Sequence, residues 1–153
     1  MNTYSEIKQK LVNHLSEILD TRIETVIREI ELAKEARDNE TKNSVGDKYE
    51  TNRTMAQFEL EKNTLLLNKT VVLKNELLQI DIHKKCDKAE FGSFVQTSAG
   101  DYFISIGLGK TEIENKPVYC ISLASPIGKM LQNKKVGDLS NFQGKAISII
   151  NIF

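Results

Sequence analysis

The sequence predicts an α+β protein, in which an antiparallel hairpin of two long helices precedes a small antiparallel β-sheet domain with one short helix. Helical periodicity continues without proline through the first 80 residues and is interrupted by one polar turn. From about residue 93, alternating β-branched residues and glycine-containing turns replace the helix-forming residues. We therefore expect a hairpin at 1–80 with its tip near 44–50, a linker at 81–92, and a sheet domain at 93–153.

The first predicted helix runs from about Tyr4 to Asp38. Its apolar residues recur at three- and four-residue steps, the spacing of one helix face. They are Ile7, Leu11, Leu15, Ile18, Leu19, Ile23, Val26, Ile27, Ile30 and Ala33. The charged residues between them fit a solvated outer face, and they include Lys8, Glu17, Glu24, Glu31 and Lys34. At about 1.5 Å per residue this helix would be roughly 50 Å long, more than a compact domain of this size needs.

The second predicted helix runs from about Asp47 to Gln79. Its apolar residues are Met55, Phe58, Leu65, Leu66, Val72, Leu73 and Leu77. Phe58, Leu65 and Val72 are seven residues apart, as in a coiled-coil seam. Because a short polar loop joins the two helices, we expect them to pair antiparallel, with these apolar stripes buried between them and a charged outer face.

The second half is predicted to contain four strands, separated by turns rich in glycine, asparagine and proline. The strands are expected at 93–97, 102–106, 118–122 and 146–153. Before the last strand, Ser125 precedes Pro126, which pairs a good N-cap residue with the proline favoured at the first helical position. A short helix should follow at 127–131 and pack on the sheet.

Composition excludes several classes of function. Lys plus Arg and Asp plus Glu each number 21, and the zero net charge gives no general attraction to duplex DNA or anionic membranes. The sequence opens without a signal peptide and has no apolar run of membrane-spanning length, so we expect a cytoplasmic protein. Its two cysteines, Cys86 and Cys120, are expected to be reduced. Zinc is disfavoured because His83 and Cys86 could begin a site, but only Cys120 and the distant His14 remain to complete its four ligands.

The sequence contains no recognisable catalytic constellation of its own. Gly109-Lys110-Thr111 matches the end of a phosphate-binding loop, but Ile104 occupies the place of that loop's first glycine, and no helix is expected to follow. Neither cysteine has the sequence context of a nucleophile, which disfavours a cysteine-based acyl transferase. We expect that the protein is not an enzyme by itself.

Two carboxylates stand at the turn between the helices, in Gly46-Asp47-Lys48-Tyr49-Glu50. If Asp47 opens the second helix, Glu50 lies one turn later on the same face. Mg²⁺ is usually held by one or two carboxylates with water or substrate oxygens, so this pair has the chemistry of a metal site at the end of the hairpin. The same residues also fit a capping-box variant, which satisfies the free N–H groups of the helix start and requires no further function.

The chain resembles the bacterial Gre transcript-cleavage factors (GreA/GreB-like), which pair an N-terminal coiled-coil hairpin with an FKBP-like C-terminal domain. Segment 46–50 stands where the family has its acidic tip. Segments 122–131 and 134–138 are similar to the family's C-terminal signature of a strand, Ser-Pro, a short helix and a Gly-Asp turn. The likeness covers nearly the whole chain in the same order. It departs at 51–53, where Thr-Asn-Arg replaces the family's usual Asn and further acidic residue.

The resemblance implies a transcription elongation factor that docks its C-terminal domain at the rim of the RNA polymerase secondary channel and passes its hairpin to the active site. Asp47 and Glu50 would help hold a second Mg²⁺, so that the polymerase hydrolyses its own backtracked transcript. The free protein would need no cofactor, since the Mg²⁺ is shared with the polymerase. Ser125, Pro126 and Ile127 would lie near the polymerase-binding surface. We expect a monomer with no membrane contact and a local contact with the RNA 3′ end.

Three other functions stay open. Some members of the wider family bind the same channel without stimulating cleavage. An FKBP-like domain could instead belong to a chaperone or prolyl isomerase, which a concave pocket lined by aromatic residues would favour. The aromatic candidates are Phe94, Tyr102, Phe103, Tyr119 and Phe142. The third function is a structural coiled-coil module that pairs with other helices, which an extended apolar outer face on the hairpin would identify.

Overall fold

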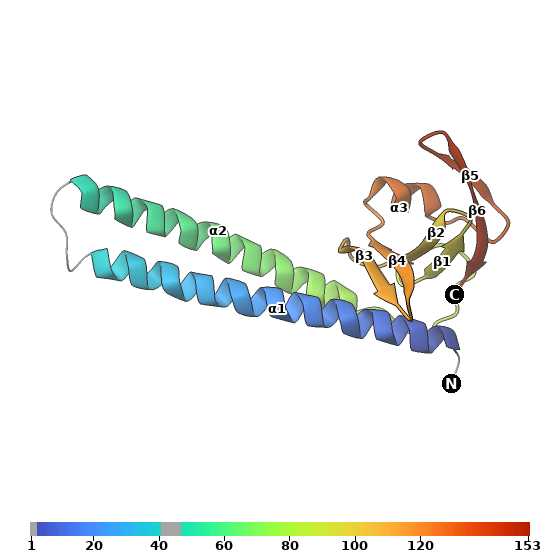
Figure 1. Cartoon of the computed structure of the whole chain (residues 1–153), viewed down its shortest axis with the longest axis horizontal. Coiled ribbons are helices and arrows are strands. Elements are labelled where there is room, and N and C mark those ends of the chain that lie inside the picture. Colours follow the sequence, from blue (N-terminus) through green and yellow to red (C-terminus); the bar gives the residue numbers. More distant parts are fainter. Residues whose placement is uncertain (1–2, 41–46) are drawn as a thin grey trace. The chain divides into compact units, whose positions relative to one another are not determined.

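The computed structural model describes residues 3–40 and 47–153 (Figure 1). Two long helices pack against each other and are followed by a six-stranded, mostly antiparallel sheet and a short helix, which confirms the predicted α+β class. The elements are α1 (Thr3–Glu40), α2 (Asp47–Leu78), β1 (Phe94–Thr97), β2 (Gly100–Ile104), β3 (Gly109–Ile113), β4 (Lys116–Ile121), α3 (Pro126–Leu131), β5 (Leu139–Phe142) and β6 (Lys145–Ile152). The chain forms two compact units, one of Ser16–Asn75 and one of Met1–Leu15 with Glu76–Phe153.

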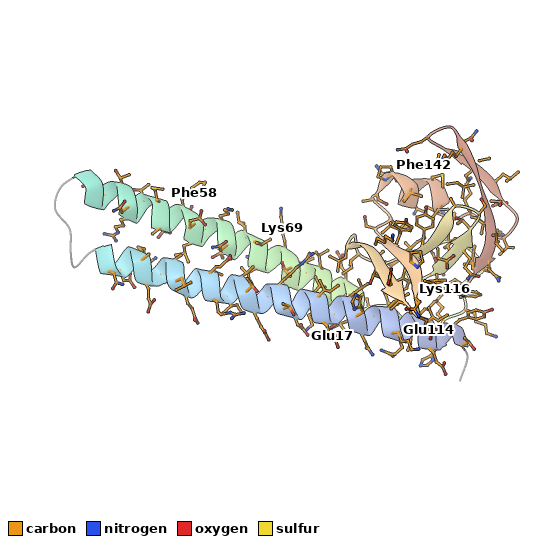
Figure 2. The ribbon with its side chains drawn as sticks, viewed as in Figure 1. Glu17, Phe58, Lys69, Glu114, Lys116 and Phe142 are labelled. Atoms are coloured by element: carbon orange, nitrogen blue, oxygen red, sulfur yellow. The ribbon has the colours of Figure 1, made fainter. Side chains whose placement is uncertain are left out.

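Within the helical unit, α1 buries most of the face that its apolar periodicity predicts, although Ile27 is exposed. Leu19 and Val26 are buried, and Ile23 and Ile30 are half-buried. Glu17 projects from α1 on the side away from α2 (Figure 2). Polar contacts also join the two helices, since the Lys74 ammonium pairs with the Asp20 carboxylate and Arg37 Nη1 donates to Gln57 Oε1 at 3.2 Å. The α1 stripe is therefore the apolar half of the hairpin interface.

The face that α2 buries differs from the predicted one. Asn63 and Thr70 are buried, and Ala56, Leu60 and Leu67 are half-buried on the same side of the helix. Of the expected seam residues, Leu77 is buried and Leu73 is half-buried as predicted. The other five are instead exposed: Met55, Phe58, Leu65, Leu66 and Val72. Apolar residues occur around much of the circumference of α2, so periodicity alone could not select the face that meets α1. The expectation of a wholly charged outer face was wrong for the same reason.

The sheet has the strand order β3-β4-β2-β1-β6-β5. All neighbouring strands pair antiparallel except β2 and β4, which are parallel with Tyr102 opposite Tyr119. The sequence prediction of an antiparallel sheet did not include this pair. It arises because β3 and β4 form a hairpin through Glu114 and Asn115, both at positive φ, and β4 then returns alongside β2.

Strands β3 and β5 were not predicted. Both lie at edges of the sheet, and neither contains a buried residue. Short polar edge strands are the usual way in which sheets avoid pairing with other chains, and they lack the apolar alternation by which a strand is recognised in sequence. The turn from β5 to β6 uses Gln143 and Gly144, both at positive φ.

The core of this unit lies between the central strands and α3. Its buried cluster comprises Cys86, Ala89, Val95, Tyr102, Ile104, Leu131, Ile149 and Ile152. Two of these, Cys86 and Ala89, come from the segment expected to be a polar linker. Two backbone hydrogen bonds fix that segment. The N–H of Ala89 donates to the carbonyl of Lys134 at 2.8 Å, and the N–H of Asn133 donates to the carbonyl of Ala89 at 2.8 Å.

Lys8 corrects a second expectation for the hairpin sequence. It was predicted on the solvated face of the first helix, yet it is 1% exposed. Its Nζ donates to the carbonyl of Lys84 at 3.2 Å and lies 4.0 Å from the sulfur of Cys86. All three residues belong to the sheet-containing unit. The first four turns of α1 therefore have different surroundings from the rest, which the helical period cannot reveal.

Candidate functional site

The two tip carboxylates occupy the first turn of α2. Asp47 is the first residue of the helix and Glu50 is the fourth, so their backbone positions are one turn apart as predicted. Glu50 is exposed. The side chain of Asp47 and the remainder of the predicted tip, 44–46, lie outside the described residues. The shared metal site therefore stays a prediction. The observed start of α2 is compatible with it.

The second predicted site is the corner where β4 leads into α3. Ser125 is the N-cap of α3, and its Oγ accepts a hydrogen bond from the N–H of Gly128 at 3.0 Å. The same hydroxyl donates to the carbonyl of Ser122 at 2.7 Å. Pro126 is the first helical residue and is exposed. The predicted N-cap and N-terminal proline are thus confirmed.

The three corner residues are not equivalent. Ile127 is half-buried and packs against the core cluster, and the hydroxyl of Ser125 is occupied by two hydrogen bonds within the corner. Pro126 is the member whose side chain faces solvent. A partner that docks here would therefore contact Pro126 directly and depend on Ser125 and Ile127 for the shape of the corner.

Gly128 is part of this corner and was not singled out by the sequence. A Cβ at this position would lie 2.1 Å from the backbone oxygen of Ser122 and 2.9 Å from Ser125 Oγ. Non-bonded contacts of that length do not occur, so α3 approaches the backbone of Ser122, which directly follows β4, only because residue 128 has no side chain. The signal in the sequence was a glycine inside a short helix, a position where glycine is usually unfavourable.

The rejected phosphate-loop match lies on a strand. Gly109, Lys110 and Thr111 belong to β3 and pair with β4, and β3 is followed by a tight turn. A phosphate-binding loop instead opens onto a helix whose N-terminus faces the anion. The structure agrees with the exclusion made from the sequence.

Both cysteines are free and buried. Burial raises the pKa of the Cys120 thiol to about 12. Burial also raises the pKa of Cys86, and the nearby Lys8 opposes this effect in part. Protonated thiols are poor nucleophiles and poor metal ligands at neutral pH. Within the described part of the chain, no three His, Cys, Asp or Glu residues are grouped so that they could hold a metal ion.

A cavity of about 370 Å³ opens beside Lys8 and Cys86 in the sheet-containing unit. Its other lining residues include Ser5, His83, Lys84 and Lys85. Burial lowers the pKa of the Lys8 ammonium, while the carboxylates of Asp81 and Glu90 oppose that shift. The Glu90 carboxylate is itself paired with Lys84 at 2.9 Å. The sequence analysis did not anticipate this cavity.

Comparison with known proteins does not assign the chain to a family. No family model matches the sequence, and no curated protein matches it either. Among the described helices, none combines the length and the apolar character that crossing a membrane requires.

Proposed function

We propose that this protein is a Gre-type transcription elongation factor, which binds bacterial RNA polymerase at the secondary channel and stimulates cleavage of backtracked transcripts. The observation that carries the proposal is the hairpin itself. Helix α1 has 38 residues and α2 has 32, which correspond to lengths of about 57 and 48 Å at 1.5 Å per residue. Helices of this length exceed what a domain of this size needs for its own core, and they suit a probe that reaches a distant active site.

The tip supplies the chemistry of the proposal. Asp47 and Glu50 stand in the first turn of α2, where two carboxylates can share one cation. In this function the polymerase contributes the other Mg²⁺ ligands, and the hairpin adds negative charge and holds the second ion of a two-metal hydrolysis. The protein is then not an enzyme by itself and needs no metal when free. The RNA 3′ end would be its local nucleic-acid contact.

The corner of β4 and α3 is the proposed docking surface. Pro126 presents an exposed, rigid apolar side chain beside the N-cap hydroxyl of Ser125. We expect Pro126→Glu to weaken polymerase binding, because it places a charge at this contact. A glutamate in the first turn of a helix is otherwise tolerated. Unchanged polymerase affinity in a variant with a natural circular dichroism spectrum would remove the corner from the docking surface.

The decisive experiment changes the charge of the tip and keeps its capping capacity. Asparagine caps a helix nearly as well as aspartate, and glutamine keeps the reach of glutamate, so Asp47→Asn with Glu50→Gln should leave the melting temperature and the polymerase binding unchanged. Stimulated cleavage on stalled complexes should fall by at least about tenfold, since Mg²⁺ binds charged carboxylates. Glu24→Gln with Glu31→Gln makes the same change of charge at exposed positions of α1 and is the matched control.

The outcomes separate the candidate functions. Cleavage at the natural rate in the tip variant would leave the two carboxylates as caps. Loss of polymerase binding in that variant would place them in docking. A natural protein that binds the polymerase but stimulates no cleavage would be a secondary-channel regulator, as the departure at 51–53 allows. A protein that fails to bind polymerase would end the proposal.

Three of the five aromatic candidates give no support to the chaperone or isomerase alternative. Phe94, Tyr102 and Phe103 are buried, and Tyr102 belongs to the core cluster. A specific observation does favour the helix-pairing alternative, because the outer face of α2 exposes apolar side chains where charge was expected. This second candidate function requires a partner helix for that face.

A further inference from the structure

The outer side of α2 carries a row of exposed apolar residues, here named the α2 stripe. It comprises Met55, Phe58, Leu65, Leu66 and Val72. Phe58 is 67% exposed, Leu65 is 65% exposed and Val72 is 54% exposed. Figure 2 shows Phe58 projecting from α2 on the side away from α1, together with Lys69. A row of large apolar residues this exposed usually marks an interaction surface.

The surface continues from the stripe toward α1. A groove of about 600 Å³ within the helical unit is lined by Leu32 and Ala36 of α1 and by Met55 and Ala56 of α2. Leu32 is itself 63% exposed. Met55 belongs both to the groove and to the stripe. The apolar surface therefore extends around the hairpin from the outer side of α2 to the groove between the helices.

The spacing of the stripe indicates the kind of partner. Phe58, Leu65 and Val72 recur every seven residues, which is the spacing of a coiled-coil seam along which a second helix packs. From Met55 to Val72 the row extends for about 26 Å at 1.5 Å per residue, close to five helical turns. A strand or a flat surface would not require such regular spacing. The partner is accordingly a helix of comparable length.

The charges on α2 point to a second copy of the same helix. Glu61 and Lys69 lie four residues before and four residues after Leu65. In an antiparallel pair centred on Leu65, Glu61 of the first copy is level with Lys69 of the second. By symmetry, Lys69 of the first copy is level with Glu61 of the second. Phe58 of each copy is then level with Val72 of its partner. Both the apolar row and the charges are self-complementary, as a two-fold symmetric interface requires.

The parallel arrangement lacks this complementarity. Lys62 and Lys69 lie within the stripe, between its apolar residues, and both are exposed. Parallel helices in register would place each lysine against its own symmetry mate, and like charges at such positions repel. The antiparallel arrangement instead places Lys69 level with Glu61 and Lys62 level with Asn68.

We propose that the α2 stripe binds the α2 stripe of a second copy of this chain, antiparallel and centred on Leu65, so that two hairpins form a four-helix assembly. The proposal departs from the monomer expected from the sequence. It goes beyond the proposed role in transcription and does not rest on it. It depends only on residues of the Ser16–Asn75 unit.

The first test compares two neighbouring valines in the full chain. Val72 belongs to the stripe, whereas Val71 lies about 100° further around the helix and is less exposed. Sedimentation equilibrium should show a dimer for the natural protein. Val72→Glu should weaken that dimer by at least about tenfold, because it places a charge in the desolvated interface, whereas Val71→Glu should leave the dissociation constant nearly unchanged. Circular dichroism establishes that both variants retain their helices.

The second test reads the direction of the pair by crosslinking. Phe58→Cys and Val72→Cys, mixed as separate single variants, should form a disulfide between each other under mild oxidation, and each alone should crosslink poorly. The natural cysteines are buried, and the natural protein treated in the same way measures their contribution. Efficient crosslinking of each variant with itself would indicate parallel helices and overturn the proposed arrangement.

Charge reversal supplies a third readout. Glu61→Lys alone and Lys69→Glu alone should each weaken the dimer, because like charges become level with each other. The double reversal should restore the natural dissociation constant. A natural protein that stays monomeric from micromolar to millimolar concentration would overturn the proposal. Because polymerase binding and transcript cleavage are measured separately, that result would leave the proposed function unaffected.

Discussion

The two long helices of the hairpin relate sequence to burial in opposite ways. In the part of α1 that belongs to the Ser16–Asn75 unit, the buried residues are apolar, namely Leu19 and Val26. In α2 the buried positions include Asn63 and Thr70, while larger apolar residues such as Phe58 are exposed. Both helices share one interface, so the difference lies in how their apolar residues are distributed. Periodicity identifies the buried face of a helix only where apolar residues are confined to one arc.

The largest expected effect comes from truncating one apolar residue in each helix, which tests whether the two residues differ in burial. Leu19→Ala should lower the free energy of unfolding of the hairpin by about 2–5 kcal/mol, because Leu19 is fully buried and its loss leaves a cavity. Phe58→Ala should change it by less than about 0.5 kcal/mol in the monomer, since exposed side chains contribute little. Urea denaturation followed by circular dichroism at dilute concentration measures both. Equal losses in the two variants would show that Phe58 is buried in solution.

A second prediction concerns the contact between Gly128 and Ser122, which hydrophobic periodicity does not predict either. Gly128→Ala should destabilise the sheet-containing unit by about 1–3 kcal/mol, because the new methyl group overlaps the carbonyl of Ser122. Ser125→Ala should cost less, about 1 kcal/mol, through the loss of the N-cap hydrogen bond. Thermal unfolding measured by near-ultraviolet circular dichroism follows this unit. A stabilised Gly128→Ala variant would contradict the close approach of α3 to the backbone of Ser122.

The smallest expected effect concerns Lys8, the charged residue that α1 buries. Burial lowers its folded-state pKa below the unfolded value, so the folded chain releases this proton at lower pH than the unfolded chain does. Below the folded pKa the full cost of burying the ammonium is present, and it fades as pH rises toward 10.5. Lys8→Met should therefore be as stable as the natural protein or more stable at neutral pH, because burial of a charge is removed.

The pH dependence of that difference is the test. The gap in free energy of unfolding between Lys8→Met and the natural protein should shrink between neutral pH and about pH 10, since neutral lysine and methionine have similar burial costs. Denaturation of both proteins in parallel cancels the titration of the other lysines. A gap that widens with pH would show that the ammonium of Lys8 is stabilised in the folded state. Lys34→Met, at an exposed position of α1, is the control.

As with the two helices, some features of the candidate sites were predictable from local sequence and others were not. The N-cap Ser125 and the following Pro126 were predictable, because capping is chemistry between residues three or four apart. The close contact of Gly128 with Ser122 was not predictable, since it depends on the conformation in which the chain turns between β4 and α3. The cavity beside Lys8 joins residues more than seventy positions apart in the sequence, and no local pattern marks it. For the tip, the sequence predicted where α2 begins, and the structure agrees that Asp47 is its first residue.

The sequence by itself determined the class of the fold, the two long helices to within two residues at each end, and the cap of α3. Those features depend on periodicity and capping, which are local interactions. Only the tertiary structure decided which face of α2 is buried, that β2 and β4 pair in parallel, and that Lys8 is enclosed. Each of these depends on a partner distant in sequence. A helix or strand carries its own hydrogen-bonding pattern, but the surface that it buries is chosen by the elements that pack against it.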